Sequence, residues 1–207
     1  VLTLLLITAV TSFFSAPYYS TLPVFARDIL GLDASGLAYL MMFGGIGAVS
    51  GALSLAVFSR RNRAGWFWLS GACVFAACFM GFAFSTQLNL SLVFIFGIGF
   101  AITVYSASAN TLLQELLPDE MRGRVASMYI LSILGGMLLG SLVAGSVALR
   151  IGVSYIFAFG GLVIIIYVPL MVMRNKSLRE LLLHRETPAE TDVRDVVSSV
   201  DVKKAAT

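Results

Sequence analysis

The sequence predicts an all-α membrane protein with six transmembrane helices, and two features of its composition support this prediction. Apolar residues make up 58% of the 207 residues and charged residues only 12%, against the roughly 25% that is usual in soluble domains. The charges are also clustered, so that long stretches hold none. These stretches are residues 1–26, 34–59, 64–114, 125–149 and 151–173. A water-soluble fold of this length does not need so much uninterrupted apolar sequence.

The uncharged stretches have the right length for helices that cross a bilayer. A hydrocarbon core about 30 Å thick needs about 20 apolar residues in a helix, so the stretch 64–114 holds two spans and each of the others holds one. Barrel strands are disfavoured, because they alternate polar with apolar residues over about ten positions and this sequence shows no such alternation. The six predicted spans are residues 2–26, 35–58, 66–85, 88–116, 123–148 and 152–173.

The first span carries polar residues along one face and two prolines in its outer half. The polar residues recur at helical spacing and therefore share that face. Pro17 and Pro23 each remove a helix hydrogen bond, so we expect bends there. The members of this stripe are Thr8, Ser12, Ser15 and Tyr19.

The second span is rich in small residues, whereas the third is bulky and almost wholly apolar. Gly47 and Gly51 stand four residues apart on one helical face, where they allow the backbone of another helix to approach closely. The third span suits a lipid-facing position. Cys73 and Cys78 lie within it on different sides of the helix, so we expect neither a disulfide nor a metal motif from them.

The fourth span repeats the polar stripe of the first. Polar side chains at membrane depth must face protein or a water-filled path, because lipid cannot satisfy them. A bond to a neighbouring helix would explain any single hydroxyl, but two stripes on corresponding spans favour a shared aqueous cavity. We therefore predict that both stripes line a transport path. The members of the second stripe are Thr103, Ser106, Asn110 and Gln114.

The fifth and sixth spans complete an internal repeat. Gly136 and Gly140 repeat the four-residue spacing of the glycine pair in the second span, and the sixth span is bulky and apolar like the third. The two triplets thus show the same three kinds of span in the same order. This order predicts a 3+3 inverted repeat, a common construction in transporters.

The positions of the basic residues predict the orientation. Lys and Arg close to span ends are retained in the cytoplasm, so we expect both the N-terminal end and the tail of this segment to be cytoplasmic, in the plasma membrane (the inner membrane of bacteria). The bilayer is then a partner and nucleic acid is not. Beyond the bundle of residues 1–174 we expect a tail, 175–207, with a short amphipathic segment followed by disorder. One side carries Arg60, Arg61, Arg63, Arg122, Arg124, Arg174, Lys176 and Arg179, and the other Arg27 and Arg150.

No catalytic constellation is present in the sequence. The only histidine, His184, lies in the tail, and there is no metal-ligand cluster and no phosphate-binding loop. We therefore expect neither an enzyme nor a cofactor nor a metal. Glu115 is the ionisable group nearest to mid-depth, and it either pairs with Arg122 or Arg124 or titrates during transport.

One loop carries a resemblance to a known family. Residues 110–127 read NTLLQELLPDEMRGRVAS, which resembles the loop between the tenth and eleventh helices of major facilitator superfamily transporters. Its Pro-x-x-x-Arg-Gly-Arg core occurs widely in that superfamily. Residues 22–31, reading LPVFARDILG, resemble the branch that exports drugs and siderophores, related to enterobactin exporters and macrolide efflux proteins. The resemblance covers residues 1 to about 180, as helices seven to twelve, the C-terminal half.

The resemblance implies a function and a gate. It implies a proton-driven exporter of a hydrophobic or amphipathic small molecule, such as a drug or siderophore, that works by alternating access with protons and a missing N-terminal half as partners. The first, second, fourth and fifth spans would line the path. Glu115, Arg122, Gly123 and Arg124 would form a cytoplasmic gate, because guanidinium groups hold carboxylates or helix C-termini in one state and release them in another. Alternatively, both arginines only fix the topology.

One departure from the family bears on this gate. Residues 59–65 read SRRNRAG, which keeps the basic charge of the family's motif between helices eight and nine but loses its Asp. The salt bridge that this Asp would form is therefore in doubt.

Two other readings remain open. The chain could be a non-transporting membrane anchor, as an assembly or sensor subunit, or a half-transporter that acts as a homodimer. Because the sequence begins at Val1, we expect it to be part of a twelve-helix transporter.

Overall fold

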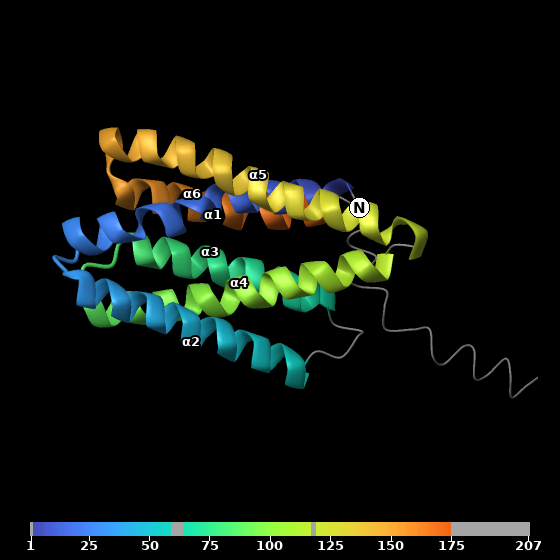
Figure 1. The fold of residues 1–207 in the computed structure, drawn as a ribbon, viewed down its shortest axis with the longest axis horizontal. Helices are drawn as coiled ribbons and strands as arrows, with labels where there is room; N and C mark the ends of the chain where they lie inside the picture. Colours follow the sequence, from blue (N-terminus) through green and yellow to red (C-terminus); the bar gives the residue numbers. More distant parts are fainter. Residues whose placement is uncertain (1, 59–63, 117–118, 175–207) are drawn as a thin grey trace, which may run out of the picture.

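The computed structural model describes residues 2–58, 64–116 and 119–174, which form six helices joined by short turns. This confirms the predicted all-α fold (Figure 1). The largest difference from the predicted bounds is at the fifth helix, which begins four residues early because the acidic residues Asp119 and Glu120 favour a helix N-terminus. The helices are α1 (Leu2–Asp28), α2 (Ala34–Phe58), α3 (Ala64–Ala83), α4 (Leu88–Leu116), α5 (Asp119–Ile151) and α6 (Val153–Arg174).

Length and composition allow five of the six described helices, α2 to α6, to cross a membrane. Helix α1 is 27 residues long, but its hydroxyl-bearing residues and two prolines lower its mean hydropathy. Both prolines lie inside an unbroken helix, in which the Thr21 hydroxyl donates a hydrogen bond to the Pro17 carbonyl at 2.7 Å.

The six helices pack as two equivalent groups of three. Helix α1 lies along α5 and α6, helix α4 lies along α2 and α3, and the two groups meet where α3 contacts α6 (Figure 1). Exchanging α1 with α4, α2 with α5 and α3 with α6 maps the contacts of one group onto those of the other and leaves the α3–α6 contact unchanged. This is the arrangement that a 3+3 repeat predicts.

The predicted glycine pair of α2 forms the closest contact within one group. A Cβ atom at Gly51 would lie 2.7 Å from the carbonyl oxygen of Phe100 in α4, and one at Gly47 would overlap the carbonyl oxygen of Phe96. Any side chain at these two positions would therefore collide with rigid backbone. The absence of side chains lets α2 and α4 pack backbone to backbone.

The glycine pair of α5 makes the matching contact in the other group. A Cβ at Gly136 would lie 2.7 Å from the carbonyl oxygen of Ala9 in α1, and one at Gly140 would overlap that of Phe13. The two contacted residues again stand four apart. The glycine spacing and the spacing of its targets are thus the same in both groups, so the two triplets share one packing register.

Glycine residues also allow α3 and α6 to approach their neighbouring helices closely, at matching positions in the two groups. A Cβ at Gly71 of α3 would lie 3.3 Å from the carbonyl oxygen of Ala101 in α4, and one at Gly160 of α6 would lie 2.8 Å from that of Phe14 in α1. Ala101 follows Phe100 as Phe14 follows Phe13, so this pair of contacts keeps the same register. The repeat therefore extends over all six helices.

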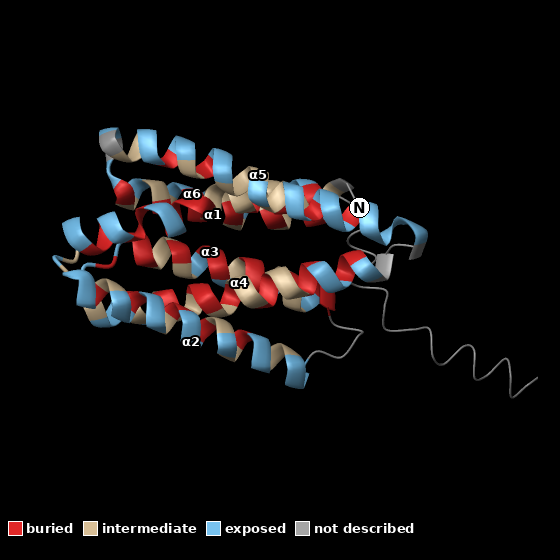
Figure 2. Cartoon of the chain, viewed as in Figure 1, coloured by how far each residue is buried: buried red, intermediate tan, exposed pale blue. Residues whose placement is uncertain are grey.

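Helices α3 and α6, which we predict to face lipid, each have one face buried in the bundle and one face exposed. Their inner faces meet in an aromatic cluster, in which the rings of Phe79 and Phe82 lie 5.2 and 5.5 Å from the ring of Phe157. Their outer faces leave large apolar side chains exposed, including Trp66 and Tyr155. Figure 2 shows buried and exposed stretches alternating along the helix ribbons. The exposed faces are the parts of α3 and α6 that the predicted lipid contact would involve, and the inner faces form part of the core.

The turn from α1 to α2 is fixed by two end caps. Gly31 has a φ of 62°, which lets the chain leave α1 while the Leu32 amide still bonds to the Ala26 carbonyl at 2.9 Å. Asp33 then caps α2, because its Oδ1 atom accepts from the Ser35 hydroxyl at 2.6 Å and the Gly36 amide at 3.0 Å. These hydrogen bonds hold the pKa of Asp33 below its usual value.

We expect Asp33→Ala to speed hydrogen–deuterium exchange at the Gly36 amide, whereas Asp33→Asn, which keeps an acceptor, should leave it near the wild-type rate. Because the pKa of Asp33 is lowered, the wild-type carboxylate stays ionised and the cap stays formed at every pH above the ordinary carboxyl pKa of 3.8. The protection then falls as the pH drops through the lowered value. Exchange at Gly36 that is unchanged by Asp33→Ala would contradict this role.

Candidate functional site

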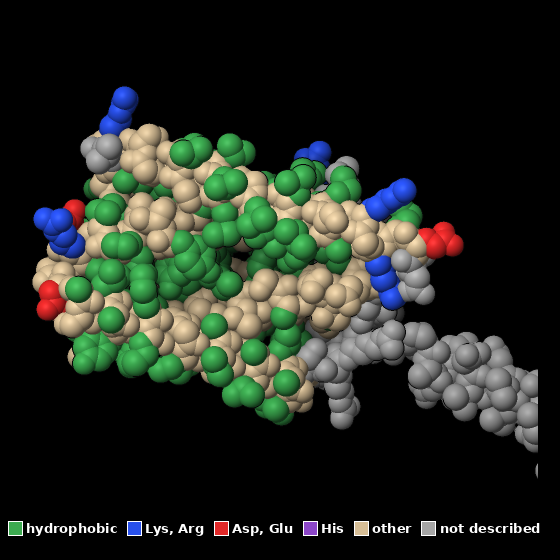
Figure 3. All heavy atoms as spheres, in the orientation of Figure 1, with side chains coloured by type: hydrophobic (Ala, Val, Ile, Leu, Met, Phe, Trp, Pro, Cys, Tyr) green, Lys and Arg blue, Asp and Glu red, His purple; other side chains and the backbone are tan. Residues whose placement is uncertain are grey.

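Charged side chains lie at the two ends of the described bundle, and the band between them is apolar (Figure 3). Arg122, Arg124 and Arg174 lie at one end, and Arg27 and Arg150 lie at the other. This is the division that the loop charges predict. Functional groups within the band must therefore be neutral polar side chains in the part of the chain described.

A cavity of about 310 Å³ opens between α4 and α5 at the end that carries Arg122. It brings together residues that the sequence placed in two separate sets. Asn110 and Gln114 belong to the fourth-span stripe, and Arg122 and Gly123 belong to the predicted gate. The lining residues are Asn110, Leu113, Gln114, Arg122, Gly123, Ala126 and Tyr129.

Side-chain hydrogen bonds organise the wall of this cavity. The Gln114 amide nitrogen donates to the Asn110 side-chain oxygen at 3.4 Å, which aligns two exposed amides one turn apart on α4. The Tyr129 hydroxyl of α5 donates to the Ser106 carbonyl of α4 at 3.4 Å. The cavity thus combines amide donors and acceptors with one guanidinium, a set that suits a polar group on an otherwise apolar molecule.

The predicted gate residues are only partly brought together. Arg122 and Gly123 line the cavity, whereas Arg124 is exposed on α5 and does not line it. Gly123 neither packs closely against a described neighbour nor adopts a dihedral angle that only glycine allows. A Cβ added there would meet no described atom within 4 Å, and Gly123 has no positive φ. It lies in the first exposed turns of a regular helix. Glu115 lies on α4, but its side chain falls outside the described residues.

The stripe on α1 does not form one continuous surface. Thr8 is buried, with 2% of its surface exposed, and Ser12 packs against Gly136 at the contact with α5. The Ser15 hydroxyl donates to the Ser12 carbonyl at 3.2 Å, and Tyr19 is exposed. This helical face therefore passes from the core at Thr8 to the surface at Tyr19.

The hydroxyls of the α4 stripe are satisfied by their own helix. Thr103 donates to the Gly99 carbonyl at 3.0 Å, and Ser106 donates to the Ile102 carbonyl at 2.7 Å. Neither hydroxyl therefore requires an aqueous partner. The amides of Asn110 and Gln114, further along α4, are the members of this stripe that face the cavity.

A second cavity, also of about 310 Å³, lies among α1, α5 and α6 and is lined almost wholly by apolar side chains. Sequence analysis did not identify it, because apolar residues on three separate helices give no local pattern. Its lining residues are Phe13, Phe14, Pro17, Gly140, Val143, Ala144, Val147, Tyr155, Ile156 and Phe159.

Sequence analysis also missed a set of buried polar groups. Thr11, Trp68, Tyr105 and Ser108 each bury a polar atom inside the bundle, and the side chains of Thr11 and Trp68 lie beside the Tyr105 hydroxyl. They stand singly within apolar helix faces, so periodicity alone treats them as core. Several of these polar side chains meet where α1, α3 and α4 face one another, and this can be seen only in the packed structure.

Six helices in two equivalent groups of three, with charge confined to the ends, define one half of a major facilitator transporter fold. A solved structure supports this class: the chain matches a mutant of the peptide transporter POT in complex with alafosfalin with a TM-score of 0.67 and 20% identity. The match covers 98% of this chain and 45% of that one, so the chain spans less than half of the transporter's length.

The family follows from the sequence comparison. The family of transmembrane secretion effectors matches residues 1–202, and the chain belongs to this family. It is therefore a multi-pass membrane protein of the major facilitator type. No curated protein matches the chain.

Proposed function

We propose that this chain is the C-terminal half of a proton-driven exporter of hydrophobic or amphipathic small molecules, such as a drug or siderophore. The observation that carries this proposal is the α4–α5 cavity. There, the exposed amides of Asn110 and Gln114 meet Arg122 at the charged end of an otherwise apolar bundle. A small molecule could bind its polar group there and its apolar part along the neighbouring helix faces.

The exposed apolar faces of the bundle support an apolar substrate in this proposal. Helices α2 and α5 leave large apolar side chains exposed along their length, including Met41, Leu53, Leu131 and Leu138. The second cavity, beside Phe13, is also apolar. These surfaces favour an apolar substrate over a sugar or an amino acid, which would need more polar partners.

A second six-helix unit completes the path in this proposal. The described half supplies one wall, formed by α1, α2, α4 and α5, and alternating access requires an opposite wall. The described side chains of the apolar band include no Asp, Glu, His, Lys or Arg, so the proton-binding group in this proposal is either in the other half or Glu115. The resemblance to enterobactin exporters and macrolide efflux proteins favours export over uptake.

The proposed orientation predicts which positions react from each side. In a background without Cys73 and Cys78, we expect a membrane-impermeant maleimide to label Ser35→Cys in intact cells, and Ser127→Cys only after permeabilisation. Both serines are exposed at opposite ends of the bundle. The reverse labelling pattern would place the cavity end outside and contradict the proposed cytoplasmic gate.

An efflux assay tests the function. The full-length protein encoded by the gene is expressed in cells that lack their main exporters, and the accumulation of Nile red and of ethidium is measured. We expect lower accumulation of at least one dye, restored by a protonophore. Unchanged accumulation of a panel of such compounds, with the protein present in the membrane, would favour the anchor or sensor role.

The alternative that this chain acts as a homodimer is tested by a separate experiment. If this chain alone, purified in detergent, forms a stable dimer and lowers dye accumulation when expressed by itself, the second wall is another copy. If it does neither while the full-length protein exports, the second wall is the other half of the same polypeptide.

A further inference from the structure

The second cavity is a groove between α5 and α6. Helix α1 packs along both of these helices, whereas α5 and α6 contact each other much less, so a wedge stays between them with α1 as its floor. Gly140 and Ala144 of α5 are buried beside this floor, and Val143 and Phe159 are exposed at the rim. The groove is therefore open at the surface of the described bundle.

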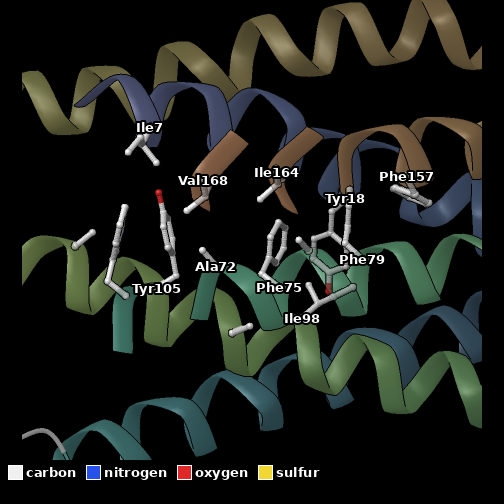
Figure 4. Close-up of a cluster of buried hydrophobic side chains, with 14 of the residues drawn as sticks. Ile7, Tyr18, Ala72, Phe75, Phe79, Ile98, Tyr105, Phe157, Ile164 and Val168 are labelled. Atoms are coloured by element: carbon white, nitrogen blue, oxygen red, sulfur yellow. The ribbon is translucent and has the colours of Figure 1, made fainter. Parts of the chain in front are cut away.

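The aromatic side chains of α6 are divided between the core and this groove. Phe157 lies among the buried side chains of the core, where its ring is 5.2 Å from that of Phe79 (Figure 4). Tyr155 and Phe159 stand two residues to either side of Phe157, so they point to the opposite side of the helix. They line the groove. The same helix thus closes the core and leaves the groove open.

The lining of the groove offers almost no polar group. Its side chains are those of Phe, Pro, Val, Ala and Ile, and Tyr155 carries the only hydroxyl among them. The volume of about 310 Å³ is at the lower end of the roughly 300–1,000 Å³ of typical ligand pockets. This room suits one hydrocarbon chain, and a polar end of the ligand must lie outside the groove.

A basic residue follows the groove on the same face of α5. Val143, Val147 and Arg150 stand four and three residues apart, so they share one helical face, and Arg150 lies about 4.5 Å beyond Val147 along the axis. Arg150 is exposed. The other arginine at this end, Arg27, lies 4.0 Å from the Asp28 carboxylate, whereas Arg150 forms no ion pair with a described residue. Arg150 can therefore accept an anion at the mouth of the groove.

We propose that this groove binds an acyl chain of an anionic phospholipid, whose phosphate lies at Arg150. Such a lipid has the two parts that the site requires, a hydrocarbon chain and an anion directly beyond it. Guanidinium groups bind phosphate through paired hydrogen bonds. Tyr155 lies at the same end of the bundle, and tyrosines at membrane interfaces sit at the level of the lipid headgroups. The site does not depend on the transport proposal, because a membrane protein meets phospholipid whether or not it exports.

Native mass spectrometry of the full-length protein tests the phosphate contact. The delipidated protein is titrated with phosphatidylglycerol, which is anionic, or with phosphatidylcholine, which has no net charge. We expect Arg150→Gln to weaken the tightest binding of phosphatidylglycerol about fivefold, the effect of one basic residue near anionic lipid, and to leave phosphatidylcholine nearly unchanged. Arg27→Gln is the matched control and should change neither affinity. Equal effects of the two substitutions would overturn the proposal.

Filling the groove tests the acyl-chain contact. Val143→Trp adds bulk inside the groove, whereas Leu142→Trp adds it at an exposed position that does not line it. Phosphatidylglycerol with a diazirine in its acyl chain is photo-crosslinked to the full-length protein, and the labelled peptides are identified. We expect label at 140–147 and 155–159, lost in Val143→Trp and kept in Leu142→Trp.

Two outcomes of the crosslinking experiment would overturn the lipid proposal. One is label that falls outside these segments or is unaffected by Val143→Trp. The other is full lipid labelling of Val143→Trp together with a loss of dye efflux, because the groove would then hold the exported compound instead of lipid. Normal lipid binding without any efflux in the wild type would contradict the proposed function alone and leave the lipid site intact.

Discussion

Gly140→Ala is expected to destabilise the protein strongly, although alanine is the better helix former. The added Cβ would overlap the Phe13 carbonyl oxygen of α1 and lie 2.9 Å from the Ala16 Cβ atom. Because the obstacle is helix backbone, α1 and α5 must move apart. We expect a loss of roughly 3 kcal/mol in unfolding free energy, the upper end of overpacking costs, measured as a lower Tm and a lower yield of monodisperse full-length protein.

The same helix supplies a matched control for this prediction. An added Cβ at Gly135 or Gly145 would meet nothing within 4 Å, so alanine there should be neutral or stabilise α5 by about 0.5–1 kcal/mol. The repeat predicts the same contrast in α2, between the damaging Gly47→Ala and the harmless Gly45→Ala. Equal stability of the Gly140→Ala and Gly135→Ala variants would contradict the close backbone contact between α1 and α5 at Gly140.

Gln114→Leu is expected to reduce export by about tenfold without loss of the protein from the membrane. The substitution removes the hydrogen bond to Asn110 and one amide from the α4–α5 cavity. A polar contact worth about 1.4 kcal/mol in the transport cycle corresponds to a factor of ten. The initial rate of dye efflux from preloaded cells measures the effect, and Asn110→Leu should behave in the same way.

Thr111→Val is the control for the cavity. Thr111 lies on α4 between the two amides and is exposed, but it does not line the cavity, and its hydroxyl bonds to the Ala107 carbonyl of its own helix at 3.0 Å. We expect efflux close to that of the wild type. Full efflux by both Gln114→Leu and Asn110→Leu would contradict a role of this cavity in transport.

The fold was predictable because the bilayer imposes one strong rule on composition. An uncharged stretch of about 20 apolar residues has few alternatives to a spanning helix, so the number and order of the helices followed from charge spacing. The glycine pairs indicated a close helix contact but not its partner. Spacing within α5 does not say that Gly140 meets Phe13, since that depends on how separate helices associate.

The candidate site was less predictable because helical spacing describes one helix at a time. The stripe on α1 shares a face by periodicity, yet Thr8 lies in the core and Tyr19 on the surface. The cavity that joins Gln114 to Arg122 forms only when the end of α4 meets the start of α5. The buried group around Tyr105 likewise depends on three helices, so no single stretch of sequence reveals it.

Alternating access is the central claim, and the labelling of two engineered cysteines tests it most directly. In the full-length protein without Cys73 and Cys78, Ala126→Cys reports the cavity end and Tyr19→Cys reports the opposite end of α1. The rate of reaction with a small water-soluble maleimide is measured with and without an exported dye. The account predicts that substrate changes the two rates in opposite directions. Two rates that do not change, or that rise and fall together, would contradict it.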